Sequence, residues 1–296
     1  MTARTVDALP DWKPLGLVPP ASLVPERLAA HWAAQIVAAA GATLCDPAPD
    51  ASHTTLTWVE SRLALAGVAL EPTSCRVALR LPNLHLMVLD AHQKTLAELS
   101  LDRRTLDEGI DWLGAELARA RGATRVDLVR PVHELPDHPA GSGGPFALER
   151  PSAYEELARW YANAWRLLAG HASELPDAPP VRIWPHHFDA AYLVALSVPA
   201  GASDASRSIG VGMSPGDASY AEPYWYVTPW PYPKDPRPPP LEGGGFWHEE
   251  GWFGAVLRAS ALPAADQSVE QARRVDAFVR SAIAACRKML GEGAKR

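Results

Sequence analysis

The stretch CRVALRLPNLHLMVLD, residues 75–90, holds two short apolar runs on either side of Pro82-Asn83. Short β-forming runs that are separated by turn residues are typical of neighbouring antiparallel strands. Similar runs lie on both sides of this stretch, at residues 55–59, 63–70 and 95–101. The region between residues 55 and 101 is therefore predicted to be an antiparallel meander.

Helices are predicted on both sides of the meander because each has its own start and stop signals. Thr105-x-x-Glu108 and Ser152-x-x-Glu155 both have the spacing of a capping box. Ser22 is a candidate N-cap, and Gln271 follows Ser268 by three residues. The four predicted helices cover residues 23–40, 105–122, 151–170 and 268–291.

The pattern of short runs returns after the third helix, at residues 181–184, 190–198, 208–213, 223–228 and 252–258. The predicted fold class is α+β, with two antiparallel β-meanders, each flanked by helices, packed into one compact body. We expect a helix-meander-helix half at residues 1–132, a Gly- and Pro-rich linker at 133–151, and a helix-sheet-helix half at 152–296. The repeated order suggests an internal duplication as a hypothesis.

Composition places the chain among soluble globular proteins. Its 296 residues are 47% hydrophobic and 21% charged, with a formal net charge of -6. That charge gives no electrostatic argument for a nucleic-acid or membrane partner. The start of the chain lacks the apolar run of a signal peptide, and the three cysteines form no CxxC pair. A cytoplasmic protein with reduced thiols is expected, and its oligomeric state is left open.

Aromatic residues gather in one segment. Ten of the 23 aromatic side chains fall between Tyr220 and Phe253. If residues 223–230 form a strand, Tyr224, Tyr226 and Trp230 share one face of it. Such rings serve either as core or as the wall of a pocket for a small-molecule ligand. The Pro-rich stretch from Pro229 to Pro240 is expected to close over the cluster.

Histidines supply the candidate chemistry. Two of them lie in Trp184-Pro185-His186-His187-Phe188-Asp189, and His248 opens a later His-Glu-Glu-Gly segment. In an extended segment His187 and Asp189 would point the same way. Together with His248 they have the residue types of a two-histidine, one-carboxylate metal site, which suits Fe(II). His187, Asp189 and His248 are therefore predicted to converge on one divalent ion, with His248 on a neighbouring strand.

Further roles follow from this prediction. Glu250 could replace Asp189 in a hydrolytic Zn site. His186, Glu250 and Asp217 are the candidate acid-base residues. The candidate substrate-binding residues are Trp184, Tyr224, Tyr226, Trp230, Trp247, Trp252 and Arg258. Histidines and acids that merely hydrogen-bond loop backbone near a Trp cluster are the plainer interpretation.

Four motifs carry a resemblance to a known family: WPHHFD at residues 184–189, SPGD at 214–217, EPYWYV at 222–227 and HxEG at 248–251. With them the chain resembles an uncharacterised bacterial family that is recorded only as a domain of unknown function. The resemblance extends to the layout of most of the chain. It implies membership of a family and brings no activity with it.

Two functions from different classes remain at this point. One is a metal-dependent enzyme, either similar to a non-haem Fe oxygenase or to a Zn hydrolase, that acts on a small molecule in an aromatic-lined pocket. The other is a non-catalytic small-molecule-binding protein with the same aromatic pocket and no metal. Bound metal in the purified protein would distinguish the two.

Overall fold

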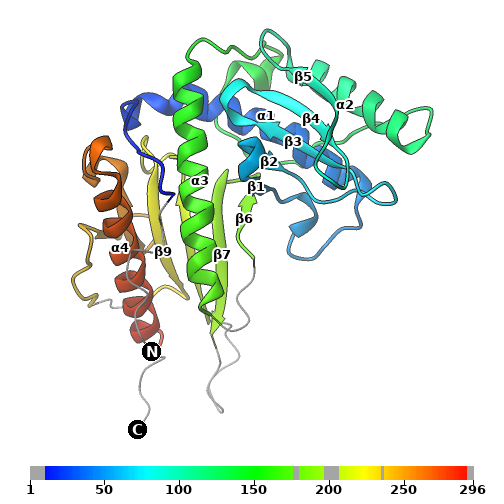
Figure 1. Ribbon diagram of the computed structural model, residues 1–296. Coiled ribbons are helices and arrows are strands. Elements are labelled where there is room, and N and C mark those ends of the chain that lie inside the picture. The colour runs from blue at the N-terminus through cyan, green and yellow to red at the C-terminus, as the bar shows by residue number, and fades with distance from the viewer. Residues whose placement is uncertain (1–10, 176–179, 197–206, 235–236, 292–296) are drawn as a thin grey trace. The chain divides into compact units, whose positions relative to one another are not determined.

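A computed structural model describes residues 11–175, 180–196, 207–234 and 237–291 (Figure 1). Within these residues there are four α-helices, α1 Val24–Leu44, α2 Leu106–Arg121, α3 Pro151–Ser173 and α4 Ser268–Met289, and two antiparallel sheets. The predicted α+β class is confirmed. The chain divides into two compact units. The N-terminal unit is Ser22–Ala162 with Arg182–Phe188, and the C-terminal unit is Met1–Ala21, Asn163–Val181 and Asp189–Arg296.

The sheet of the N-terminal unit is the predicted meander. Its strands β1 Thr57–Val59, β2 Ala64–Ala66, β3 Arg76–Arg80, β4 His85–Leu89 and β5 Thr95–Ser100 pair in chain order. At Pro82-Asn83 a single 3-10 turn joins β3 to β4, and Leu84 has a positive φ of 48° that completes the reversal. A buried cluster of Ala64, Ala66, Ala78, Met87 and Leu89 forms part of the core of this unit.

Small residues allow the helices of this unit to pack closely. The Ala-rich helix α1 is buried along most of its length. A Cβ atom added to Gly109 of α2 would lie only 2.7 Å from Cδ1 of Ile36 on α1. The capping box that starts α2 is confirmed, because Thr105 Oγ1 accepts from Glu108 N and Glu108 Oε2 accepts from Thr105 N.

The second sheet has six strands in the order β10-β11-β9-β8-β7-β6. They are β6 Arg182–Trp184, β7 Asp189–Leu196, β8 Arg207–Ser214, β9 Tyr224–Trp230, β10 Phe246–His248 and β11 Gly254–Arg258. The predicted meander order is confirmed for its five strands, since β11 pairs with β9 as the chain order implies. The short strand β10, which the sequence pattern missed, pairs with β11 and takes the edge of the sheet.

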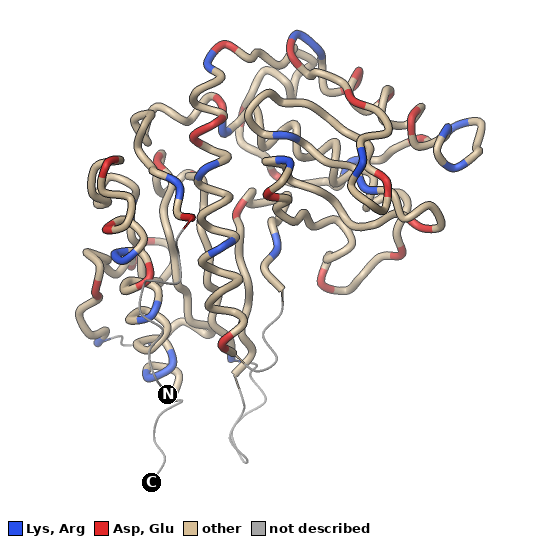
Figure 2. Tube along the Cα trace, viewed as in Figure 1, with Lys and Arg blue, Asp and Glu red and all other residues tan. Residues whose placement is uncertain are grey.

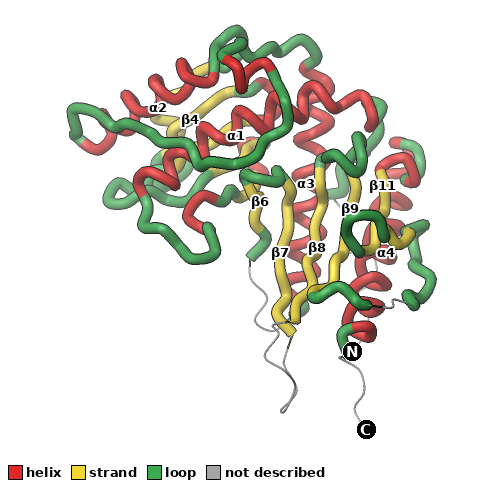
Figure 3. Tube along the Cα trace, turned by 180° about the vertical axis from the view of Figure 1, so that it is seen from behind, coloured by secondary structure: helices red, strands yellow, loops and turns green. Residues whose placement is uncertain are grey.

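Helix α4 and the later turns of α3 cover one face of the sheet in the C-terminal unit, as Figures 1 and 3 show from opposite sides. Trp225, Val227 and Val211 are fully buried on that face. Side chains at the alternate positions point to the other face, which no helix of this unit covers among the described residues (Figure 3). We call this second face the open face.

Gln271 of α4 holds the N-terminal segment of the chain. Its side chain is fully buried, and its Oε1 accepts from the backbone N–H of Leu15 at 3.0 Å. Its Nε2 donates to the carbonyls of Leu15 and Pro263, both at 2.8 Å. Trp12 donates to the same Oε1 and stacks on Trp225 with ring centroids 6.1 Å apart. The spacing of Ser268 and Gln271, which helped to predict the start of this helix, forms no capping box, because the side chain of Gln271 points into this contact.

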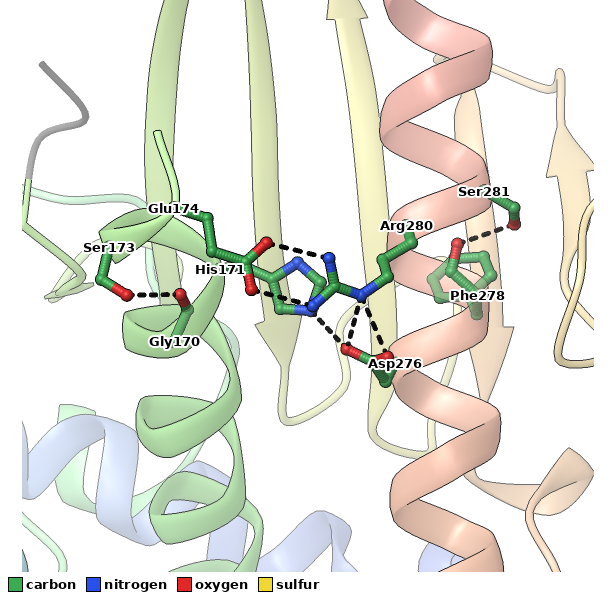
Figure 4. Close-up of polar contacts among 8 residues, drawn as sticks. All are labelled: Gly170, His171, Ser173, Glu174, Asp276, Phe278, Arg280 and Ser281. Atoms are coloured by element: carbon green, nitrogen blue, oxygen red, sulfur yellow. Dashed lines mark hydrogen bonds and ion pairs between the residues drawn. The ribbon is translucent and has the colours of Figure 1, made fainter. Parts of the chain in front are cut away.

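A polar network joins α3 to α4 in the C-terminal unit (Figure 4). Asp276 receives hydrogen bonds from His171 Nε2 at 2.8 Å and from Arg280 Nε at 3.1 Å. Arg280 also donates to both carboxylate oxygens of Glu174, at 2.9 and 3.0 Å. Burial opposes the charge of Asp276, but the hydrogen bonds from His171 and Arg280 outweigh it, so the pKa of this carboxyl is lowered.

Figure 2 shows acidic and basic residues interspersed along both α3 and α4. None of the helices in the described part of the chain has the length and apolar character that a membrane crossing requires.

The predicted linker, residues 133–151, belongs to the N-terminal unit and includes a 3-10 helix, Pro139–Ser142. The compact units therefore do not coincide with the predicted halves.

Candidate functional site

Several predicted ligand-binding residues do share the open face of the C-terminal sheet. The regular register of β9 with β8 and β11 puts Tyr224, Tyr226 and Trp230 on that face, as predicted. Arg258 of β11 pairs with Tyr224 of β9 and lies on the same face. Trp247 does not, since it pairs with Ala255 on the helix side, stacks on Phe253 at 5.2 Å and donates to the carbonyl of Pro239.

Tyr226 reaches across a whole strand to its hydrogen-bond partner. Its ring lies over Gly212 of β8, and its hydroxyl donates to Asp189 on β7. Burial and the neighbouring carboxylate of Asp189 raise the pKa of Tyr226 well above its usual value, so the phenol stays protonated and acts as a donor. A glycine at position 212 is what permits this path.

A second tyrosine-carboxylate pair lies beside the first. Tyr224 donates to Asp217 in the loop between β8 and β9. The other carboxylate oxygen of Asp217 accepts from the backbone N–H groups of Ser219 and Tyr220, at 2.8 and 3.1 Å. Burial, reinforced by Asp217, also raises the pKa of Tyr224. The predicted acid Asp217 is thus an exposed carboxylate that also shapes its own loop.

Alanine at position 212 should separate Tyr226 from Asp189. The new Cβ would lie 2.5 Å from the ring and hydroxyl of Tyr226, so the ring would have to move. We expect Gly212→Ala to lower the free energy of unfolding by about 1–3 kcal/mol in urea denaturation. Gly210→Ala is the control, because the one close neighbour of its Cβ is the rotatable Thr228 Oγ1, at 2.8 Å, and Leu193 Cδ1 lies at an ordinary contact distance of 3.9 Å. Equal losses in both variants would contradict this account.

The predicted metal set does not converge. Asp189 begins β7 and His248 ends β10, with β8, β9 and β11 between them. Four interstrand steps of about 4.8 Å place these strands about 19 Å apart, beyond the reach of one ion. Both ring nitrogens of His248 are already engaged, with the hydroxyl of Tyr220 and the carbonyl of Glu250, each at 2.7 Å. The prediction that His248 lies on a strand next to Asp189 is wrong.

The extended geometry that was expected for WPHHFD is also wrong. Residues 185–188 form a turn, in which Phe188 has a positive φ of 57° and its N–H donates to the carbonyl of Trp184 at 2.6 Å. His31 Nε2 and Gln35 Nε2 of α1 both donate to the carbonyl of Pro185, each at 2.8 Å. The turn is therefore held rigidly within the N-terminal unit.

This turn presents His186 and His187 side by side. Their ring centroids lie 4.3 Å apart, and the ring of His133 lies 5.5 Å from that of His186. Trp184 contacts His186 edge-on at 5.9 Å. Sequence reasoning missed His133, because it stands alone in the predicted linker, far from residue 186 in the chain. Burial lowers the pKa of His186 to about 4, with further contributions from His187 and His133.

An open cleft of about 690 Å³ lies next to these histidines in the same unit. Its lining residues are Trp32, His133, Glu134, Leu135, Asp137, His138, Pro139, Gly141 and Ser142. Trp32 Nε1 donates to the carbonyl of Pro136 at 2.9 Å and so fixes the loop against α1. Burial lowers the pKa values of His133 and His138, so both imidazoles are neutral at physiological pH.

The remaining predicted residues lie at the rim of the open face. Trp252 contacts the ring of His248 at 4.2 Å, and Glu250 is exposed. In the Pro-rich stretch, the carbonyl of Pro239 accepts a hydrogen bond from the indole of Trp247. Residues 235–236 of that stretch lie outside the described residues, so its closure over the cluster stays a prediction.

No protein-family profile, curated protein or solved structure matches the chain. The resemblance to the uncharacterised bacterial family therefore stays a prediction.

Proposed function

We propose that this protein binds a small polar molecule in the cleft between α1 and the loop of residues 133–142. The observation that carries the proposal is the cleft itself, whose volume of about 690 Å³ falls in the range of ligand sites. Residues of the N-terminal unit line it, and the rigid histidine turn of the same unit stands beside it.

The lining indicates which ligand chemistry fits. Neutral His133 and His138 each carry one donor and one acceptor nitrogen, and Glu134 and Asp137 carry only acceptors. His138 Nδ1 accepts from the N–H of Ala140 at 3.1 Å, which leaves its Nε2–H to donate. A ligand rich in hydroxyl or amine groups matches this balance. His186, unprotonated at neutral pH and next to His133, adds a further hydrogen-bonding imidazole beside the cleft.

Filling the cleft should abolish binding. We expect Ser142→Phe to remove the saturation-transfer NMR signals of any polyol or amino alcohol that binds the wild type. His133→Ala should weaken binding by about tenfold, the effect of one or two lost hydrogen bonds. Ala147→Phe is the matched control, since this exposed residue lies between the loop and α3, outside the cleft lining. Binding that survives Ser142→Phe would rule out the cleft.

A metal-dependent function has support from one observation at the same place. An imidazole centroid lies about 3.2 Å from the metal it binds, so two rings on one ion lie about 4.5–5.2 Å apart. The separations of His186 from His187 and His133, 4.3 and 5.5 Å, are close to that range. In the described residues no three His, Cys, Asp or Glu side chains stand ready to hold an ion, so the rings would have to rotate.

This second candidate replaces the predicted ligands Asp189 and His248 with His133 and His186. We expect tag-free protein to bind about one Zn²⁺ per chain in calorimetric titration, and either His133→Ala or His186→Ala to weaken binding at least tenfold. His92→Ala, at an exposed turn of the same unit, should leave it unchanged. If all three variants lowered the Zn²⁺ affinity equally, the ion would be binding to surface histidines in general, and the metal proposal would be wrong.

A further inference from the structure

A cluster of aromatic rings at one end of the open face has no role in the cleft. Tyr220 is at its centre, with ring centroids 5.0 Å from Tyr224, 6.2 Å from Phe246 and 5.6 Å from His248. Trp252 extends the cluster through His248. All of these residues belong to the C-terminal unit. We refer to these five residues as the aromatic cluster.

Solvent reaches several of these rings. Phe246 is 39% exposed, and Tyr220, His248 and Trp252 are half-buried. Tyr220 meets its three neighbours at interplanar angles of 64°, 77° and 69°. Rings that meet edge to face turn their electron-rich faces in different directions, as the walls of a binding site for a cation do.

The hydrogen-bond donors of the cluster are already used within the protein. Tyr220 donates to His248 Nδ1, and His248 Nε2 donates to the carbonyl of Glu250. Tyr224 donates to Asp217, and Trp252 Nε1 donates to Ser219 Oγ at 3.2 Å. Burial raises the pKa of Tyr220 as well, which keeps its phenol protonated. Ring faces are what the cluster still offers to a ligand, and the carboxylate of Asp217 lies beside them; both favour a positive charge.

Most of the charged side chains near the cluster are acidic. Asp217 is exposed beside Tyr220 and Tyr224, and Glu249 and Glu250 follow His248 directly. Arg258 is 3.8 Å from Glu222, and its guanidinium lies over the ring of Phe246, 5.6 Å from the centroid. The protein thus already places one of its own cations on a ring of this cluster.

We propose that the aromatic cluster, with Asp217 as counter-ion, is a binding site for a small organic ammonium ion. The ammonium group lies against the rings of Tyr220 and Trp252, where the carboxylate of Asp217 balances its charge. This site lies in the C-terminal unit and does not depend on the cleft function proposed above.

Benzylammonium and its neutral counterpart benzyl alcohol make a matched pair of probes for this site. We expect ligand-observed NMR titration of the full chain to give at least about tenfold tighter binding for the cation. Asp217→Asn, which keeps the acceptor for Ser219 and removes the charge, should weaken benzylammonium binding about three- to tenfold and leave benzyl alcohol unchanged. Trp252→Leu, at the rim of the cluster, should do the same through the loss of a ring.

Trp247→Phe is the control, because this tryptophan lies on the opposite face of the same sheet. Its affinity for benzylammonium should equal that of the wild type. Equal affinity of the wild type for both probes would overturn the proposal, and so would an equal loss of binding in Trp247→Phe. Thermal melting of each variant distinguishes loss of the site from loss of the fold.

Discussion

Replacing Gln271 with alanine should lower the free energy of unfolding by about 2–4 kcal/mol, one of the largest single effects that we expect in this chain. The side chain is fully buried and bonds both the N–H and the carbonyl of Leu15. Alanine would leave these backbone groups buried without their partner, and the cost of desolvation would no longer be offset. Urea denaturation, followed by tryptophan fluorescence, measures the loss.

Gln267 provides the matched control for this experiment. It precedes α4 by one residue, is exposed, and its side chain caps no backbone group. Gln267→Ala should therefore change the free energy of unfolding by less than about 0.5 kcal/mol. If Gln271→Ala were equally mild, the hydrogen bonds of Gln271 would contribute little to holding the segment around Leu15.

Local signals in the sequence predicted most of the regular elements. The capping box at Thr105 works because both of its hydrogen bonds form between residues three apart, so no tertiary contact is needed. Alternation in β9 placed Tyr224 and Tyr226 on one face for the same reason. These features depend on backbone geometry within a few residues, which the sequence carries directly.

Features set by distant contacts were not predictable in this way. Ser268 and Gln271 have the spacing of a cap, yet Gln271 turns inward because Leu15 lies within its reach. Strand β10 is only three residues long and follows Gly243-Gly244-Gly245, so it is too short for its alternating pattern to be recognised. Its place at the sheet edge, which separates His248 from Asp189, depends on how β11 pairs with β9.

The candidate sites show the same division. The sequence drew attention to His186 and His187 because they are adjacent, and to the aromatic segment because of its density. It gave no sign of His133, whose contact with His186 depends on the path of the loop before α3. A lone histidine in a Pro-rich segment has no period or spacing that marks it.

Acid should weaken the N-terminal unit through His31. This imidazole is 5% exposed, donates to the carbonyl of Pro185 and stacks on Phe188 with ring centroids 5.0 Å apart and planes within 6°. Burial is the main cause that lowers its pKa from 6.5 to about 4, while the hydrogen bond to Pro185 opposes the shift. The charged or titratable groups that disfavour its protonation are Arg27, His133 and His187.

The direction of the effect follows from proton linkage. Between pH 6.5 and about 4 the unfolded chain binds a proton at His31 that the folded protein does not. Stability from this group is therefore complete above pH 6.5 and is lost as the pH falls towards 4. The loss should reach about 3 kcal/mol, since one pKa unit corresponds to about 1.4 kcal/mol.

His31→Gln should separate this contribution from those of the other histidines. At pH 7 the variant should be less stable than the wild type by about 1–2 kcal/mol, because it loses the stack on Phe188 and the fixed donor to Pro185. Denaturant titrations at several pH values should show this difference change by about 2–3 kcal/mol in favour of the variant between pH 7 and pH 4.5, since glutamine takes up no proton. The control is His92→Gln, at an exposed turn, whose curve should run parallel to that of the wild type. If the His31→Gln curve also stays parallel to that of the wild type, proton uptake at His31 contributes nothing to acid unfolding.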